Sequence, residues 1–209
     1  MSLTKRTRQF AARLEVRGPG DKDKNKRTIG GLLVPYGVRA RLRSLGAVEV
    51  FEQFEAGGMT EYEDGAAYLV SHDHARAVAR SPDTLSWSET EEGFHVEATV
   101  DTRDPDAAGL VNKIENGVFQ GQSVGFIPLR ESMEEERNED GDLQSVTYTV
   151  HEWSFFEASA VTFPVYTESD LDLRRRSEIE SMIKQDRGVL PQTRARTRRG
   201  LLLLARHGD

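Results

Sequence analysis

The stretch DPDAAGLVNKIENGVFQGQSVGFIP, Asp104–Pro128, holds the clearest structural signals in the chain. Asp104 can cap a helix, Pro105 suits its first turn, and Gly117 can end it. Apolar residues recur between them at helical spacing, so one face of this helix should pack on a sheet (Ala107, Leu110, Val111, Ile114 and Val118). The residues from Gly121 onward predict a glycine-rich strand that follows the helix.

Most of the chain around this stretch reads as short strands. Phe94, Val96 and Ala98 alternate with polar residues, which is the period of a half-buried strand. The predicted strands are 29–36, 48–54, 67–70, 85–88, 94–100, 146–150 and 154–163. Glu131–Asp142 contains seven acidic residues and one Arg, and we interpret it as a solvated loop. The pattern predicts a strand-dominated body with one clear helix, consistent with a small β-barrel or an α+β fold.

Composition excludes several classes of site. The 209 residues suffice for one substantial domain with appendages, or at most two small domains. The absence of cysteine excludes a disulfide scaffold, a Cys nucleophile, an iron–sulfur cluster and a Cys-ligated zinc site. No apolar run approaches the roughly 20 residues that span a bilayer, and no apolar stretch follows the basic N-terminus. We therefore expect an intracellular protein without a signal peptide or membrane contact.

Charge is distributed unevenly along the chain. Residues 172–209 hold ten basic and five acidic side chains, a net of +5, so the other 171 residues carry −12 of the total −7. An acidic body argues against nucleic acid as the main partner, because phosphate repels it. We divide the chain into a flexible N-terminal segment with a possible first strand (1–27), a central domain (28–170) and a basic, helical or disordered tail (171–209).

His72 is the first candidate for chemistry. It follows the apolar strand AYLVS directly, and the end of a strand is where a rigid scaffold presents a side chain to a loop. His74 lies two residues on, so the two could form part of a metal site. Zinc needs three or four protein ligands, however, and the sequence offers no HExxH-type motif. We expect no metal and no cofactor, and the alternative role for His72 is to cap the strand.

Ser123 lies in GQSVG, which matches the GxSxG pattern of hydrolases only superficially. That nucleophile elbow requires a strand, a sharp turn and then a helix. Here the helix comes first and a strand continues after the motif, so the elbow is excluded. Gly121 and Gly125 flank Ser123 on its own face of the strand and predict open space around its hydroxyl. The alternative is an ordinary serine in a weakened strand.

Glu157 is the candidate partner for a histidine. In SFFEASAVTFP it shares a strand face with Phe155, Ser159 and Val161. A carboxylate on an apolar face is costly unless it is paired or hydrogen-bonded. His151 is the competing candidate for the same role.

Six landmarks in order over Thr28–Ser169 resemble the prohead (capsid maturation) protease family of tailed bacteriophages, which is similar in fold to the herpesvirus assemblin proteases. They are GLLVPY, VEVFEQFEAGGM, LVSHD, GFHVEATV after a hairpin, GQSVGF after a helix ending in NG, and FFEASAVTFPVY. The chain departs from the family pattern at three places: Gly57-Gly58-Met59 replaces Pro-Gly-Ala-Phe, Ser71 replaces Asn, and Val165 replaces Ala.

The resemblance implies an α+β fold built on a small, mostly antiparallel, assemblin-like β-barrel with few flanking helices. It also implies a serine endopeptidase, with Ser123 as nucleophile and His72 as general base. Glu157 matches the family's acidic landmark and would be the third member, with His151 as the alternative because assemblins use a second histidine. The protease domain would then be residues 28–170.

The resemblance also implies partners and a location. Substrates would be the major capsid protein and scaffold segments, with self-cleavage and contacts to the portal or shell. The enzyme would act inside the immature capsid (prohead) in the host bacterial cytoplasm, where the basic tail could help to carry it. Two rival hypotheses are a catalytically inactive capsid-assembly or scaffolding protein on the same fold, and a metal hydrolase built on His72 and His74.

Overall fold

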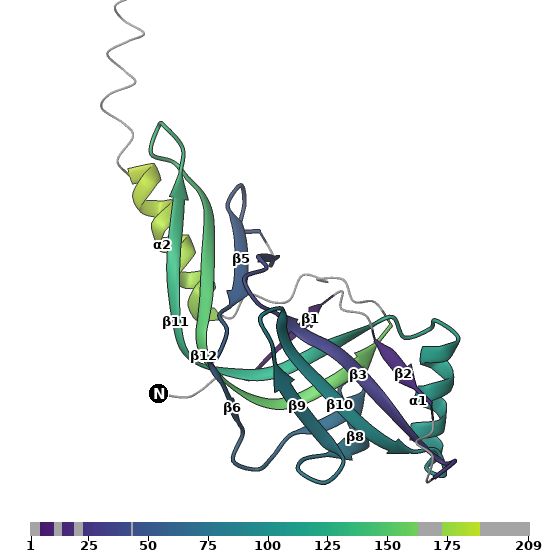
Figure 1. The fold of residues 1–209 in the computed structure, drawn as a ribbon. Helices are drawn as coiled ribbons and strands as arrows, with labels where there is room; N and C mark the ends of the chain where they lie inside the picture. The colour runs from purple at the N-terminus through teal and green to yellow at the C-terminus, as the bar shows by residue number, and fades with distance from the viewer. Residues whose placement is uncertain (1–4, 11–13, 19–22, 43, 163–172, 189–209) are drawn as a thin grey trace, which may run out of the picture.

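The computed structural model describes residues 5–10, 14–18, 23–42, 44–162 and 173–188, which form two β-sheets and two helices (Figure 1). The larger sheet contains β1 (Arg6–Phe10), β4 (Ala40–Arg41), β5 (Glu49–Phe54), β6 (Met59–Glu61), β7 (Ala67–Val70), β8 (Asp73–Arg80), β11 (Gly121–Arg137) and β12 (Leu143–Val161). The smaller sheet contains β2 (Glu15–Arg17), β3 (Lys26–Pro35), β9 (Leu85–Glu89) and β10 (Gly93–Asp101). The helices are α1 (Pro105–Glu115) and α2 (Leu173–Gly188).

The 19-residue strand β12 organises the larger sheet. Along one edge it pairs antiparallel with β11. Along the other edge it pairs in succession with three parallel strands, first β5, then β6 and then β7. The far edge of β11 pairs with β1, and β8 folds back on β7. Segments distant in sequence therefore meet on a single strand.

The main core lies between the two sheets. Four aromatic rings meet edge to face there, with centroid distances of 5.4 Å for Phe54–Trp153, 5.2 Å for Phe94–Trp153 and 5.1 Å for Phe94–Phe155. Such pairs contribute specific geometry in addition to their large apolar area. Helix α1 adds Leu110 to this core. Asp104 caps α1 by accepting a hydrogen bond from the Asp106 N–H, so the predicted helix and its cap are confirmed.

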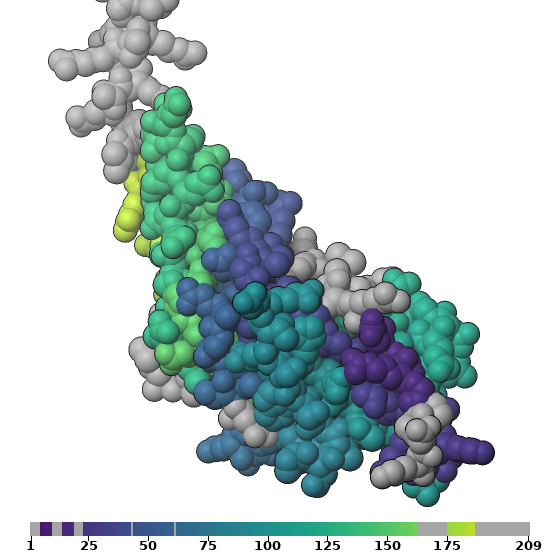
Figure 2. Space-filling model, in the orientation of Figure 1, coloured from purple at the N-terminus to yellow at the C-terminus, as the bar shows by residue number. Residues whose placement is uncertain are grey.

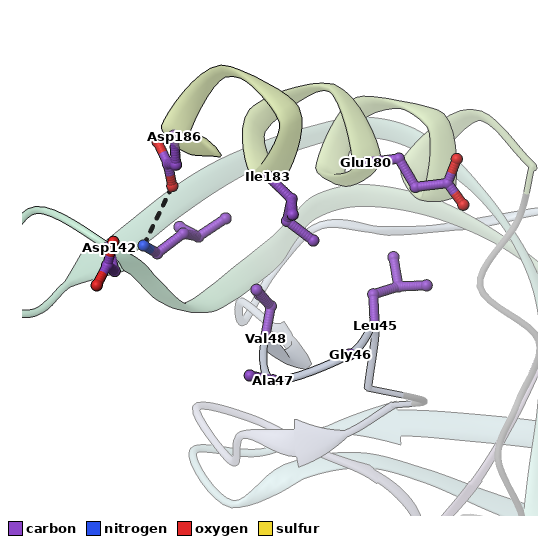
Figure 3. A pocket seen from close by; sticks show the side chains of 9 residues that line it. Leu45, Gly46, Ala47, Val48, Asp142, Glu180, Ile183 and Asp186 are labelled. Carbon is purple, nitrogen blue, oxygen red and sulfur yellow. Dashed lines mark hydrogen bonds between the residues drawn. The ribbon is translucent and has the colours of Figure 1, made fainter. Parts of the chain in front are cut away.

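The distal half of the β11–β12 hairpin extends beyond this core (Figure 1). We call this half, together with β4, β5 and α2, the arm; it gives the molecule its elongated outline (Figure 2). A second apolar cluster fills the arm and includes Val50, Val146 and Ile179. A pocket of about 350 Å³ lies between α2 and the turn before β5, where Ile183 faces Leu45 and Val48 (Figure 3). Neither described helix has the length and hydrophobicity needed to traverse a bilayer.

A buried ion cluster ties β1 and α2 to the sheet. The Glu52 carboxylate accepts hydrogen bonds from Arg8 Nε at 2.5 Å and from an Arg175 guanidinium nitrogen at 2.6 Å. Glu131 accepts from Arg6 and Arg175, each at 2.7 Å. The side chains of Glu52 and Arg175 are both only 1% exposed. Burial alone would raise the pKa of Glu52, but the charges of Arg8 and Arg175 and their hydrogen bonds lower it to about 2.

The structure confirms the α+β class and corrects two expectations. The predicted barrel is not seen in the described residues, because the larger sheet ends at β1, β4 and β8 and the smaller sheet ends at β2 and β9. The acidic segment Glu131–Asp142 is a loop only in its last five residues, because β11 continues to Arg137 and the turn to β12 spans 138–142. Glu131 and Met133 are partly buried and residues 134–141 are exposed, so contacts with β12 and α2 support the first part of a strand that charge alone would not predict.

The division into domain 28–170 and tail 171–209 stays a prediction. Residues 163–172 and 189–209 lie outside the described part of the chain. Within that part, α2 packs on the strands of the arm through Arg175, Ile179 and Ile183. The N-terminal segment contributes the strands β1 and β2.

The two neighbouring arginines of α2 provide a direct test of the ion cluster. Arg175→Met should lower the free energy of unfolding by about 3 kcal/mol, because it leaves the buried Glu52 and the partly buried Glu131 with one cation fewer. Arg176→Met is the matched control, since Arg176 forms an exposed pair with Glu180; it should cost no more than about 0.5 kcal/mol. Urea unfolding measures both. Equal effects would show that the cluster does not hold α2.

Candidate active site

A strained turn presents His72 at the end of β7. Ser71 and His72 have φ angles of 55° and 61°, in the left-handed region that side-chain-bearing residues rarely occupy. The Ser71 N–H donates to the carbonyl of Ala160 at 3.1 Å, and the His72 N–H donates to Ser159 Oγ at 3.2 Å. Both bonds go to β12, so the strand that pairs with β7 also fixes the turn that follows it. Strain of this kind is typical of functional sites.

The structure brings His72, Glu157 and Ser159 together. His72 Nδ1 lies 2.5 Å from Glu157 Oε1, and Ser159 Oγ donates to the same oxygen at 2.8 Å. We assign the proton of the first bond to Nδ1, because a carboxylate can only accept. Glu157 and Ser159 alternate along β12 with core residues, so the site lies on the face of the sheet turned away from the core.

Glu157 is a buried carboxylate, with 4% of its side chain exposed, whereas His72 is 28% exposed. Burial by itself would raise the pKa of Glu157. The hydrogen bonds from His72 and Ser159 and the charges of His72 and His74 outweigh this effect and lower the pKa below its usual 4.5. Glu157 is therefore ionised at neutral pH, as a group that orients and stabilises an imidazolium must be.

Ser123 stands opposite Ser159 in the β11–β12 ladder. Its side chain is fully buried, and its hydroxyl donates to the backbone carbonyl of Arg8 in β1 at 3.1 Å. Within the part of the chain that the structure describes, the Ser123 hydroxyl therefore bonds to β1 and not to His72. The structure thus assembles the His72–Glu157 pair and places Ser123 one strand away, with its hydroxyl directed toward β1.

The prediction of open space around Ser123 is wrong. A Cβ atom built on Gly125 would lie 2.8 Å from Glu157 Cβ and 2.9 Å from the ring of Phe156. The pairing register shifts between Gly125 and Phe126, which places both Phe156 and Glu157 near this glycine. Gly125 therefore allows the acidic residue to approach β11 closely.

The other two histidine candidates lie elsewhere. His151 Nδ1 lies 2.6 Å from Glu55, and its Nε2 lies 2.6 Å from Ser132 Oγ, so both ring nitrogens are engaged away from His72. His74 is exposed on β8. Within the described ranges, no three His, Cys, Asp or Glu side chains converge as metal ligands.

Sequence reasoning missed two contributors to the site. Ser159 connects the His72 backbone to the Glu157 carboxylate, and its position two residues after Glu157 on one strand face was the available signal. Strand β1 contacts Ser123, but no local pattern in Arg6–Phe10 indicated which strand it would join.

The left-handed conformation of Ser71 predicts how substitutions there change the stability of the protein. Ser71 is exposed, and Asn tolerates its left-handed conformation better than Ser does. Ser71→Asn should therefore raise the free energy of unfolding by up to about 1 kcal/mol, and Ser71→Val should lower it by at least about 1 kcal/mol, because β-branched residues tolerate this conformation worst. Denaturant titration of both variants tests this. The same stability for both would mean that Ser71 does not hold this conformation.

Comparison with known proteins assigns the chain to a family. Neither curated proteins nor solved structures gave a significant match. A family model described as caudovirus prohead serine protease matches residues 14–185, which include His72, Ser123 and Glu157 and most of the chain. The chain therefore belongs to the family of caudovirus prohead serine proteases.

Proposed function

We propose that this protein is a serine endopeptidase that cleaves the major capsid protein and scaffold segments inside the immature phage shell. The observation that carries the proposal is the 2.5 Å contact between His72 and Glu157, one strand from Ser123, in a chain of this family. We extend the proposal to self-cleavage, to portal or shell contacts, and to docking by the basic residues after α2.

The geometry supports a catalytic sequence in which Ser123 attacks the substrate and His72 transfers the protons. With its proton on Nδ1 and donated to Glu157, His72 has an unprotonated Nε2 that can accept the Ser123 hydroxyl proton. Ser123 Oγ then forms a bond to the scissile carbonyl carbon. The imidazolium gives its proton to the leaving amine as the C–N bond breaks, which leaves an acyl-enzyme. Water, activated by His72, hydrolyses that ester and restores Ser123.

Glu157 and Ser159 act through His72 in this sequence. The Glu157 carboxylate fixes the tautomer of the imidazole and stabilises its positive charge. Ser159 holds the carboxylate with its hydroxyl proton and the histidine backbone with its oxygen. Ser123 must exchange its bond to Arg8 for one to His72 before attack, and this change involves β1.

The nucleophile can be identified by covalent labelling. A fluorophosphonate, which phosphonylates activated serines, should label Ser123, and peptide mapping should find no label on Ser159. Ser123→Ala and His72→Ala should each abolish cleavage of the co-expressed major capsid protein, a loss on the order of 10³-fold or more. Label on Ser159, or normal cleavage by either folded variant, would overturn the assignment. Intact shells that retain uncleaved capsid protein would favour the alternative of an inactive assembly protein.

The third residue can be assigned by comparing Glu157→Gln with His151→Ala. Gln preserves the shape of the side chain and removes its charge, so kcat should fall on the order of 10³-fold with KM little changed. His151→Ala should keep kcat within a few-fold of the unaltered protein, because His151 contacts Glu55 and Ser132. The reverse ranking would assign the role to His151, as in the assemblins.

A further inference from the structure

Strand β1 occupies an edge of the sheet that a peptide could use. Within the described residues, the outer edge of β11 from Gln122 to Phe126 pairs only with β1, antiparallel and over five residue pairs. An unpaired edge of this kind accepts an extended peptide through its backbone N–H and C=O groups. β1 thus has the direction and backbone pairing that an extended peptide would adopt beside the nucleophile strand.

The position of β1 relative to Ser123 is specific. Gln9 lies opposite Ser123 in the ladder, and the preceding carbonyl, that of Arg8, accepts the Ser123 hydroxyl at 3.1 Å. A peptide carbonyl within hydrogen-bond reach of the nucleophile is what a bound substrate would provide. As long as Arg8 holds this bond, the hydroxyl proton is directed away from His72.

Side chains on one face of β1 hold the strand in place. Arg6 and Arg8 are two residues apart, so they point to the same side of the strand and reach the ion cluster at the base of the arm. Glu131 pairs with Arg6 at 2.7 Å, and Glu52 pairs with Arg8 at 2.5 Å. Arg175 of α2 also binds both carboxylates. On this face, the side-chain contacts that hold β1 are therefore mainly ionic, in addition to its backbone pairing with β11.

We propose that the edge of β11 from Gln122 to Phe126 is the binding site for extended peptide substrates, and that β1 closes this site in the resting chain. The inference rests on the proposed function, because only a peptidase needs a peptide beside Ser123. Displacement of β1 leaves each of the two carboxylates still paired with Arg175. A tethered segment competes at an effective concentration on the order of millimolar, so a substrate must be similarly concentrated to replace β1.

Arg6→Gln in the full chain tests the proposal. It removes the charge that pairs with Glu131 and leaves the residues of the site unchanged. The value of kcat/KM on denatured casein should rise several-fold through a lower KM, and the amides of β1 and of residues 122–126 should exchange hydrogen faster. Arg17→Gln is the matched control. Arg17 lies in the short strand β2 and forms an exposed ion pair with Glu97. The substitution should change neither measurement.

A peptide with the sequence KRTRQF, that of Lys5–Phe10, provides a second measurement independent of catalysis. Added at millimolar concentration to full-length Arg6→Gln/Ser123→Ala, it should slow amide exchange over residues 122–126. In the active Arg6→Gln protein it should raise KM and leave kcat unchanged. If Arg6→Gln does not fold, Arg6→Lys keeps the charge, loses the guanidinium geometry and should shift the same quantities less.

The outcomes separate the two proposals. A folded Arg6→Gln with faster exchange in β1 but equal or lower kcat/KM would overturn the closing role of β1. No protection of residues 122–126 by the peptide would overturn the binding site. If no variant cleaves any substrate while the peptide protects these amides, the peptide site stands and the proposed peptidase activity is wrong.

Discussion

The hydrogen-bonded ladder along β12 is the constraint on which the rest of the structure depends. One strand of 19 residues pairs with β11 on one side and with β5, β6 and β7 in succession on the other. Because register along a strand is fixed by its neighbours, the distances among Glu157, Ser159 and Ser123 follow from the same ladder that builds the sheet. The turn after β7 then hydrogen-bonds to this ladder and positions His72.

A site built this way keeps its geometry at a local cost. Two consecutive side-chain-bearing residues occupy the left-handed region, and a carboxylate is buried on the face away from the core. A single side chain offsets both costs, because the Ser159 hydroxyl accepts a hydrogen bond from the His72 N–H and donates one to the Glu157 carboxylate. Ser159 is thus the residue through which the strained turn and the buried charge stabilise each other.

Local patterns in the sequence predicted the parts of the fold that local physics decides. The caps of α1, the strand Ala67–Val70 and the alternation in β10 lie where the sequence indicates. The acidic half of β11 was misread because its support comes from β12 and α2, which a local pattern does not reveal. The burial of Ser123 was missed for the same reason, since β1 is more than a hundred residues away in sequence. The contact between His72 and Glu157 could be anticipated, because a carboxylate in an otherwise apolar strand needs a partner. The register shift opposite Phe156 nevertheless puts Glu157 on the face away from the core and not on that of Phe155.

The ion cluster under β1 suits a strand that must leave. A buried ion cluster is a weak source of stability compared with an apolar contact of the same size, because desolvation offsets much of the Coulomb attraction. If apolar side chains held β1 instead, however, each displacement of the strand would expose those side chains to water. Arg6 and Arg8 regain hydration when β1 leaves, and Arg175 still pairs with both Glu52 and Glu131, so one of the two negative charges stays compensated. Hydration of the two arginines offsets part of the cost of opening, the closed state retains a defined register, and α2 is placed where any change in its packing alters the hold on β1.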